Sequence, residues 1–173
     1  MEVDWRCSRR VSFEFVPLTK AHDRAAFDCG VPSLNSYLQR SARQNQDRDI
    51  GRTCVALEPG QVRVWGYYTL SSASTEFEEY PENAGLPRYP IPAVLLARLA
   101  VDKQRHGQGL GRELLIHALG VARRHADSVG ATIVIVEAID EAAQAFYEKY
   151  GFRLLNKPGR HLYLTMKQIR RMP

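Results

Sequence analysis

The sequence predicts a mixed α/β fold, and three observations carry that prediction. Two apolar runs of strand length, residues 93–101 and 132–138, indicate buried strands. Between them, residues 109–129 repeat apolar side chains at helical spacing, and shorter β-rich segments occur towards both ends of the chain. The 173 residues, 45% of them hydrophobic, suit one compact unit with a core, so we expect a single domain over residues 1–173.

The first expected elements are a strand and two short helices. Residues 12–18 alternate apolar and polar side chains up to Pro17, which is typical of a strand. Residues 21–29 and 32–44 are predicted as helices. Pro32 punctuates the start of the second helix, whose leucine, tyrosine and alanine side chains form an apolar face.

A hairpin and a long loop are expected next. Residues 52–58 and 62–74 are rich in β-forming side chains, and the intervening Pro59-Gly60 is a turn signal, so we expect the two segments to pair. Residues 76–92 contain four prolines, which are too many for a helix or a central strand. This stretch is predicted to be a stiff loop.

The second half supplies the principal helix and the remaining strands. Residues 93–101 are apolar except for Arg98, which predicts a strand buried on both faces. The amphipathic helix 109–129 ends before Gly130, and residues 132–138 form the next buried strand.

The chain closes with a short helix and two more strands. Residues 141–150 have helical composition and period and stop at Gly151. Residues 153–156 and 161–166 are the last predicted strands, on either side of a Pro-Gly turn.

Net charge and cysteine content limit the kinds of binding partner and the cellular compartment that we expect. The 24 Lys and Arg against 19 Asp and Glu give a net charge of +5, which favours a polyanion such as RNA; a generally basic surface, or charge for a cofactor's phosphates, explains it equally well. Cys7, Cys29 and Cys54 are widely spaced, so we expect reduced thiols and neither a metal site nor a disulfide. No apolar stretch approaches the roughly 20 residues of a membrane span, and residues 1–10 are charged, so we expect a cytoplasmic protein without membrane contact.

A glycine-rich turn between a buried strand and the long helix indicates phosphate binding. Gly107, Gly109 and Gly111 let the backbone approach a pyrophosphate, while free N–H groups at the helix start supply donors. Arg105 and Arg112 would add charge at the rim. The sequence of this turn matches neither a Walker A loop nor the dinucleotide-binding motif G-x-G-x-x-G. A merely structural tight turn would need only one glycine.

The motif Gln104-Arg105-His106-Gly107-Gln108-Gly109 resembles the Q/R-x-x-G-x-G/A signature of the GNAT family of N-acetyltransferases, and AFYEKYGF, residues 145–152, resembles a second family signature. The resemblance implies a mostly antiparallel central sheet flanked by helices, and acetyl-coenzyme A as the acetyl donor. The cofactor-binding residues that it implies are Leu99, Ala100, Val101, Gln104, Arg105, His106, Gly107, Gln108, Gly109, Leu110, Gly111, Arg112, Phe146 and Tyr150.

The same resemblance implies how the reaction proceeds. Tyr147 would be the general acid, because the departing thiolate needs a proton and a phenol with a pKa of about 10 is protonated at neutral pH. Tyr150 is its chief rival, and we expect Tyr150 and Phe146 to pack. Backbone N–H groups around Leu99 to Val101 would meet the oxyanion.

The nature of the amine follows from a missing carboxylate. Residues 93–101 contain none, and only about one lysine amine in a thousand is deprotonated at neutral pH, whereas an α-amine with a pKa of about 7.7 needs little help. An α-amino substrate is therefore favoured, with Glu58, Asp102 or an acid linked through water as alternative bases. Asp140 stands where many relatives have an asparagine after the fifth strand.

Three longer segments narrow the resemblance further. Residues 27–57, the proline-rich 86–92 with the strand after it, and 140–152 resemble the acetyltransferase toxins of bacterial toxin–antitoxin pairs. This resemblance implies acetylation of aminoacyl-tRNA, homodimers and a ribbon-helix-helix antitoxin. The alternatives are an enzyme for a small amine or a protein N-terminus, and a cofactor-binding module without catalysis. The candidate tRNA-binding cations are Arg40, Arg43, Arg88 and Arg98, with Arg48 and Arg52 in addition.

Overall fold

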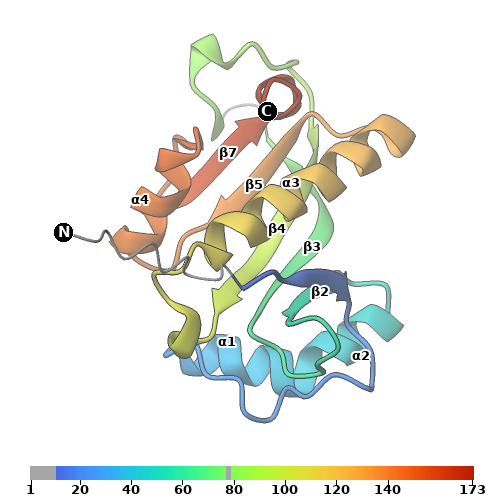
Figure 1. Ribbon diagram of the computed structural model, residues 1–173. Coiled ribbons are helices and arrows are strands. Elements are labelled where there is room, and N and C mark those ends of the chain that lie inside the picture. The colour runs from blue at the N-terminus through green and yellow to red at the C-terminus, as the bar shows by residue number, and fades with distance from the viewer. Residues whose placement is uncertain (1–10, 77–78) are drawn as a thin grey trace, which may run out of the picture.

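A computed structural model describes residues 11–76 and 79–173, and within them the chain forms a mixed α/β fold around one seven-stranded sheet (Figure 1). The sheet order is β1-β2-β3-β4-β5-β7-β6. Every neighbouring pair is antiparallel except β4 and β5, which run parallel. The predicted mixed α/β class with a mostly antiparallel sheet is confirmed. The strands are β1 Glu14–Pro17, β2 Arg52–Leu57, β3 Gly66–Thr75, β4 Ile91–Val101, β5 Ile133–Glu137, β6 Arg153–Leu154 and β7 His161–Thr165.

Helices cover both faces of the sheet. The α-helices are α1 Pro32–Ser36, α2 Ala42–Asp47, α3 Leu110–Val129, α4 Glu141–Lys149 and α5 Met166–Ile169. Within the described residues, short turns of other helix types are η1 Tyr37–Ser41, η3 Glu82–Ala84 and η4 Lys103–Arg105. One core cluster joins α3, α4 and α5 to one face, and α3 crosses that face in Figure 1. On the opposite face, α1 and η1 pack over β2 and β3, and the segment around Tyr80 packs over β4, β5 and β7.

The middle of the sheet opens into a fork between β4 and β5. These strands pair only from Ala93 to Leu96 on the β4 side. Opposite β3, Thr69 pairs with Arg98 and Leu70 pairs with Leu96, so that Ala97 has no partner and forms a bulge. Beyond the bulge β4 leaves β5, which is why the predicted burial on both faces fails from Ala97 to Leu99, where the side chains are partly exposed.

The bulge also changes which way the strand's side chains point. Before it, Leu96 faces the α3 core. After it, Leu99 and Val101 face that core, while Arg98 and Ala100 lie on the α1 side. The extra residue therefore turns Arg98 out of the apolar core under α3, where its charge would have no partner.

Two of the predicted helices near the N-terminus differ from the observed elements. The predicted helix 21–29 is wrong, because this segment forms turns that are held by Asp23, which bridges to Arg63 and whose side chain accepts from the backbone of Ala25. The predicted helix 32–44 begins at Pro32 but continues to Asp47, through the π-type turn η1.

The predicted boundaries of the strands and the loop also need correction. β3 begins at Gly66 and not at residue 62. The predicted loop 76–92 contains the short helix η3, and its last two residues belong to β4. Pro92 is tolerated in a central strand because β4 has not yet begun to pair with β5 at that point.

The helices of the second half begin and end where local signals place them. Gly109, in the left-handed region with φ 85°, precedes α3, and Gly130 follows it. Asp140 caps α4, because its carboxylate accepts a 2.7 Å hydrogen bond from the backbone N–H of Ala143.

Cys29 and Cys54 are buried free thiols, and Cys7 lies outside the described residues. Of the helices that the structure describes, none has the length and apolarity that a membrane crossing requires.

Candidate active site

The glycine turn at the end of β4 presents an open backbone surface. Gly107 has φ 72° and Gly109 has φ 85°, values that favour glycine, and a Cβ on either residue would meet no atom within 4 Å. No side chain caps the start of α3. The first N–H groups of a helix have no partners within that helix, so those from Gly109 to Arg112 are donors for an anion at the positive helix end.

Hydrogen bonds within the turn fix its shape. The Asp102 carboxylate accepts from the backbone N–H of Gln104 at 2.9 Å and from that of Asp28 at 3.1 Å. The His106 ring lies 2.7 Å, Nε2 to oxygen, from the Val101 carbonyl. Asp102 is buried with both oxygens engaged. It therefore holds the turn, a role that sequence reasoning missed.

Two residues expected to act near the turn neutralise each other instead. The guanidinium of Arg105 forms an ion pair with Glu58 and stacks on the ring of Trp65, 4.4 Å from its centroid. The expectation that the Arg105 side chain adds charge at the rim is therefore corrected, because Glu58 balances that charge. Arg112 is exposed at the first turn of α3.

An aromatic cluster on α4 lies beside the glycine turn. The Phe146 ring contacts those of Tyr147 and Tyr150 edge to face, with centroids 5.3 Å and 5.1 Å away. A Cβ placed on Gly111 would lie 3.8 Å from the Phe146 ring and 3.8 Å from Val101. The start of α3, the end of β4 and α4 therefore meet at one place, as the two motifs predicted.

Tyr147 is the more buried of the two candidate tyrosines. It is 6% exposed, and its ring packs against Phe152 at 5.5 Å. Burial raises the pKa of Tyr147 far above its ordinary value, so the phenol stays protonated. Its hydroxyl has no hydrogen-bond partner within residues 11–76 and 79–173. Tyr150 is partly exposed at the end of α4, where it packs against Phe146.

The end of β4 contributes backbone groups at the fork. Leu99, Ala100 and Val101 pair with β3 on one side, whereas on the other side the pairing with β5 ends at Leu96. Strand edges without a neighbour present free N–H and C=O groups. The bulge that places them there has no sequence signal apart from Arg98, a charge inside an apolar run.

Among the candidate tRNA-binding arginines, Arg98 lies on the α1 side of the sheet, whereas Arg52 lines the α3 side. The Arg98 guanidinium lies 4.2 Å from the centroid of the Tyr37 ring in η1. Arg40 follows in η1 and Arg43 in α2, and Arg88 is exposed in the loop before β4. Arg52 forms a 2.5 Å ion pair with Asp49. The structure does not bring these six cations into one cluster, and Arg98 is the one that lies beside the fork.

Comparison with known proteins agrees with this geometry. The family model described as acetyltransferase (GNAT) domain matches residues 49–154. A protein named tRNA-acetylating toxin, from Mycobacterium tuberculosis, is 37% identical over 155 residues, which cover 88% of this chain and 92% of that protein.

The toxins KacT and AtaT have solved structures with the same fold. A tyrosine-to-phenylalanine mutant of KacT has a TM-score of 0.86 and 32% identity, with 91% of this chain and 97% of that chain covered. AtaT complexed with acetyl-methionyl-tRNAfMet has a TM-score of 0.85 and 31% identity, with 92% and 98% covered. An AtaT mutant bound to the C-terminus of the antitoxin AtaR and acetyl-CoA has a TM-score of 0.79 and 31% identity, with 91% and 96% covered.

These comparisons confirm the resemblance to acetyltransferase toxins, and the family model spans both the glycine turn and the aromatic helix. The chain therefore belongs to the GNAT family of N-acetyltransferases.

Proposed function

We propose that this enzyme is a toxin that transfers an acetyl group from acetyl-coenzyme A to the α-amine of aminoacyl-tRNA and thereby blocks translation. The observation that carries the proposal is the meeting of the glycine turn, the end of β4 and the Tyr147 helix at the β4–β5 fork. The relatives named for tRNA acetylation, and AtaT with its acetylated tRNA, support the choice of substrate.

The residues present fit acetyl-coenzyme A, whose thioester supplies the activated acetyl group. The open backbone from Gln104 to Arg112, with His106, Gln108 and Leu110 between, would hold the diphosphate, because two left-handed glycines leave that side clear. Phe146 and Tyr150 would pack against the part of the molecule that leads towards the fork.

The chain's own groups then serve the acetyl transfer. The protonated Tyr147 hydroxyl, which has no partner among the described residues, would donate its proton to the departing sulfur. Backbone N–H groups from Leu99 to Val101, beyond the last β4–β5 pair, would stabilise the negative charge that develops on the carbonyl oxygen.

The engagement of both alternative bases supports an α-amine as the acceptor. Of the two alternative bases, Glu58 is paired with Arg105, and Asp102 is buried with both oxygens accepting backbone N–H groups. A lysine side chain with a pKa of about 10.4 would need such a base, whereas an α-amine with a pKa of about 7.7 is often neutral already.

The tRNA would approach from the α1 side of the sheet. Arg98 with Tyr37 lies beside the fork on that face, and Arg40, Arg43 and Arg88 would contact phosphates further out. We extend the proposal to a single domain over residues 1–173, a homodimer, a cytoplasmic location and a ribbon-helix-helix antitoxin. The neighbour bound to the C-terminus of its antitoxin supports an antitoxin as the partner.

Mass spectrometry of tRNA-bound amino acids tests the proposal directly. Purified protein is incubated with charged tRNA and isotope-labelled acetyl-coenzyme A, and we expect labelled acetyl on the α-amine of at least one amino acid. Induced expression should also arrest growth, Tyr147→Phe should abolish the arrest, and Tyr150→Phe should retain it. Unimpaired growth with a protein that acetylates small amines or protein N-termini would instead establish the alternative enzyme.

A further inference from the structure

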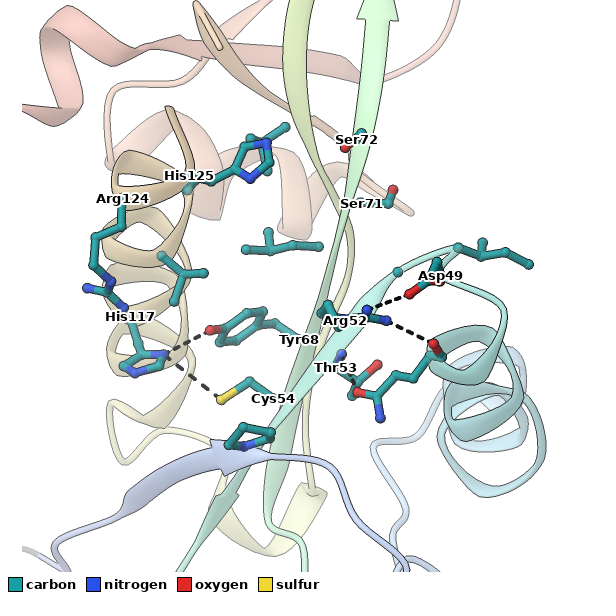
Figure 2. Close-up of a pocket in the computed structure, with 18 of the residues that line it drawn as sticks. Asp49, Arg52, Thr53, Cys54, Tyr68, Ser71, Ser72, His117, Arg124 and His125 are labelled. Carbon is teal, nitrogen blue, oxygen red and sulfur yellow. Dashed lines mark hydrogen bonds and ion pairs between the residues drawn. The ribbon is translucent and has the colours of Figure 1, made fainter. Parts of the chain in front are cut away.

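A pocket that the proposed reaction does not use lies on the α3 side of the sheet. It has a volume of about 630 Å³ and is lined by α3, by β1 to β4, and by residues 46–52 (Figure 2). Its lining residues, all in the described part of the chain, include none from the glycine turn or from α4. Its volume lies in the range of about 300–1,000 Å³ that is usual for small-molecule sites.

The floor of the pocket is apolar and rigid. Tyr68, Leu70 and Val94 of the sheet and Ala122 of α3 are all buried and belong to the main core. At the rim, Ile50 is 54% exposed, although it is a large aliphatic side chain. An apolar ligand would remove this surface from water at a gain of about 25 cal/mol for each Å².

The polar side chains on the floor already have partners. The Tyr68 hydroxyl lies 2.9 Å from Nδ1 of His117, whose ring stacks on Phe15 at 5.0 Å. The Cys54 thiol lies 4.0 Å from the same nitrogen (Figure 2). These three groups contact one another through Nδ1 of His117, so the Tyr68 hydroxyl and the Cys54 thiol are engaged within the floor.

The charged side chains around the pocket differ in whether an ion-pair partner neutralises them. The one carboxylate among the lining residues, Asp49, is paired with Arg52. Arg124 has no ion-pair partner in the part of the chain that the structure describes, and its Nη1 lies 3.8 Å from the position of a Cβ on Gly120. The guanidinium thus lies along α3 towards Gly120, at the outer edge of the pocket, with its donors available to an acceptor.

We propose that this pocket binds a small organic carboxylate, with its apolar body over Tyr68 and Leu70 and its carboxylate on Arg124. Both parts of the ligand follow from the lining: the buried floor selects the apolar body, and the unpaired arginine selects the negative charge. The hydroxyl of Ser72, on the same face of β3 as Tyr68 and Leu70 and across from α3 in Figure 2, offers a further hydrogen bond at the edge.

Two compounds that differ only in charge test the proposal. Titration of the isotope-labelled protein with phenylbutyrate or with phenylbutyramide, at up to millimolar concentration, is followed by the backbone amide resonances. We expect phenylbutyrate to shift resonances of Leu70 and Ser72 and to bind about tenfold more tightly than the amide, which corresponds to one charge-assisted hydrogen bond. Equal affinities, or no binding of phenylbutyrate, would overturn the proposal.

Neighbouring arginines provide a matched pair of variants. Arg124→Gln should weaken phenylbutyrate to the affinity of the amide, whereas Arg123→Gln, at an exposed residue that does not line the pocket, should leave it unchanged. Ser72→Trp, at an exposed β3 position, should block the binding of both compounds. The amide resonances of residues away from the pocket should still show a folded protein. Equal losses in the two arginine variants would show binding to general surface charge only. Because neither acetyl-coenzyme A nor tRNA is present, the result does not depend on the proposed reaction.

Discussion

Replacing Gly109 with alanine tests whether the glycine turn holds a diphosphate. Gly109 has φ 85°, and a Cβ there would meet nothing within 4 Å, so folding loses only the cost of a left-handed alanine, about 1–2 kcal/mol. The melting temperature should fall by about 2–4 °C for each kcal/mol in a chain of this size. The same methyl would occupy the open side of the turn, and we expect the Kd for acetyl-coenzyme A to rise at least ~10-fold, or ~1.4 kcal/mol.

A second glycine separates the effect on binding from the effect on folding. Gly85 has φ 68° in the loop before β4, and a Cβ there would also meet nothing within 4 Å. Gly85→Ala should therefore lower the melting temperature by a similar amount and leave the Kd unchanged, as measured by isothermal titration calorimetry. The reasoning is refuted if Gly109→Ala binds acetyl-coenzyme A as tightly as Gly85→Ala does.

Three further variants test the chemistry and the supports of the site. Tyr147→Phe should lower kcat by about 10²–10⁴-fold with little change in the Kd for acetyl-coenzyme A, and a loss of the same size in Tyr150→Phe would show that the assignment is wrong. Asp102→Asn can accept only one of the two backbone N–H groups, so urea unfolding should show a loss of about 1–3 kcal/mol; an unchanged midpoint would contradict this role. Burial raises the pKa of the Cys54 thiol from 9.0 to about 11, so the folded state binds this proton more tightly than the unfolded state does. The contribution of this thiol to the free energy of unfolding should therefore be complete below pH 9 and should be lost as the pH rises towards 11. Cys54→Ala should flatten that fall, and an equally steep profile would exclude the thiol as its source.

Local patterns were enough to predict the parts of the site that are continuous in sequence. The glycine turn and the aromatic helix each combine a strand or helix signal with a motif, and the structure confirms that they meet. The helix 109–129 was equally predictable, because its apolar period is long and glycines bound it at both ends.

Features that depend on distant partners were not predictable. The ion pair of Arg105 with Glu58 joins residues far apart in the chain, and the bulge at Ala97 is a property of the β3–β4 register. The segment 21–29 has helical composition but forms turns, because its backbone bonds to Val62 and its side chains bond locally instead. Tertiary contacts there outweigh a weak local preference.

The unpaired residue in β4 decides which of the following side chains face the core. If β4 kept Ala97 but paired with β3 without a bulge, every side chain from Arg98 to Val101 would change sides of the sheet. Arg98 would then enter the apolar core beneath α3, while Leu99 would face α1 and η1 on the other side of the sheet. Deleting Ala97 would instead make Leu96 and Arg98 consecutive, and each would keep the side of the sheet that it occupies now. A variant shortened by this one residue should therefore keep the same core while it loses the bulge.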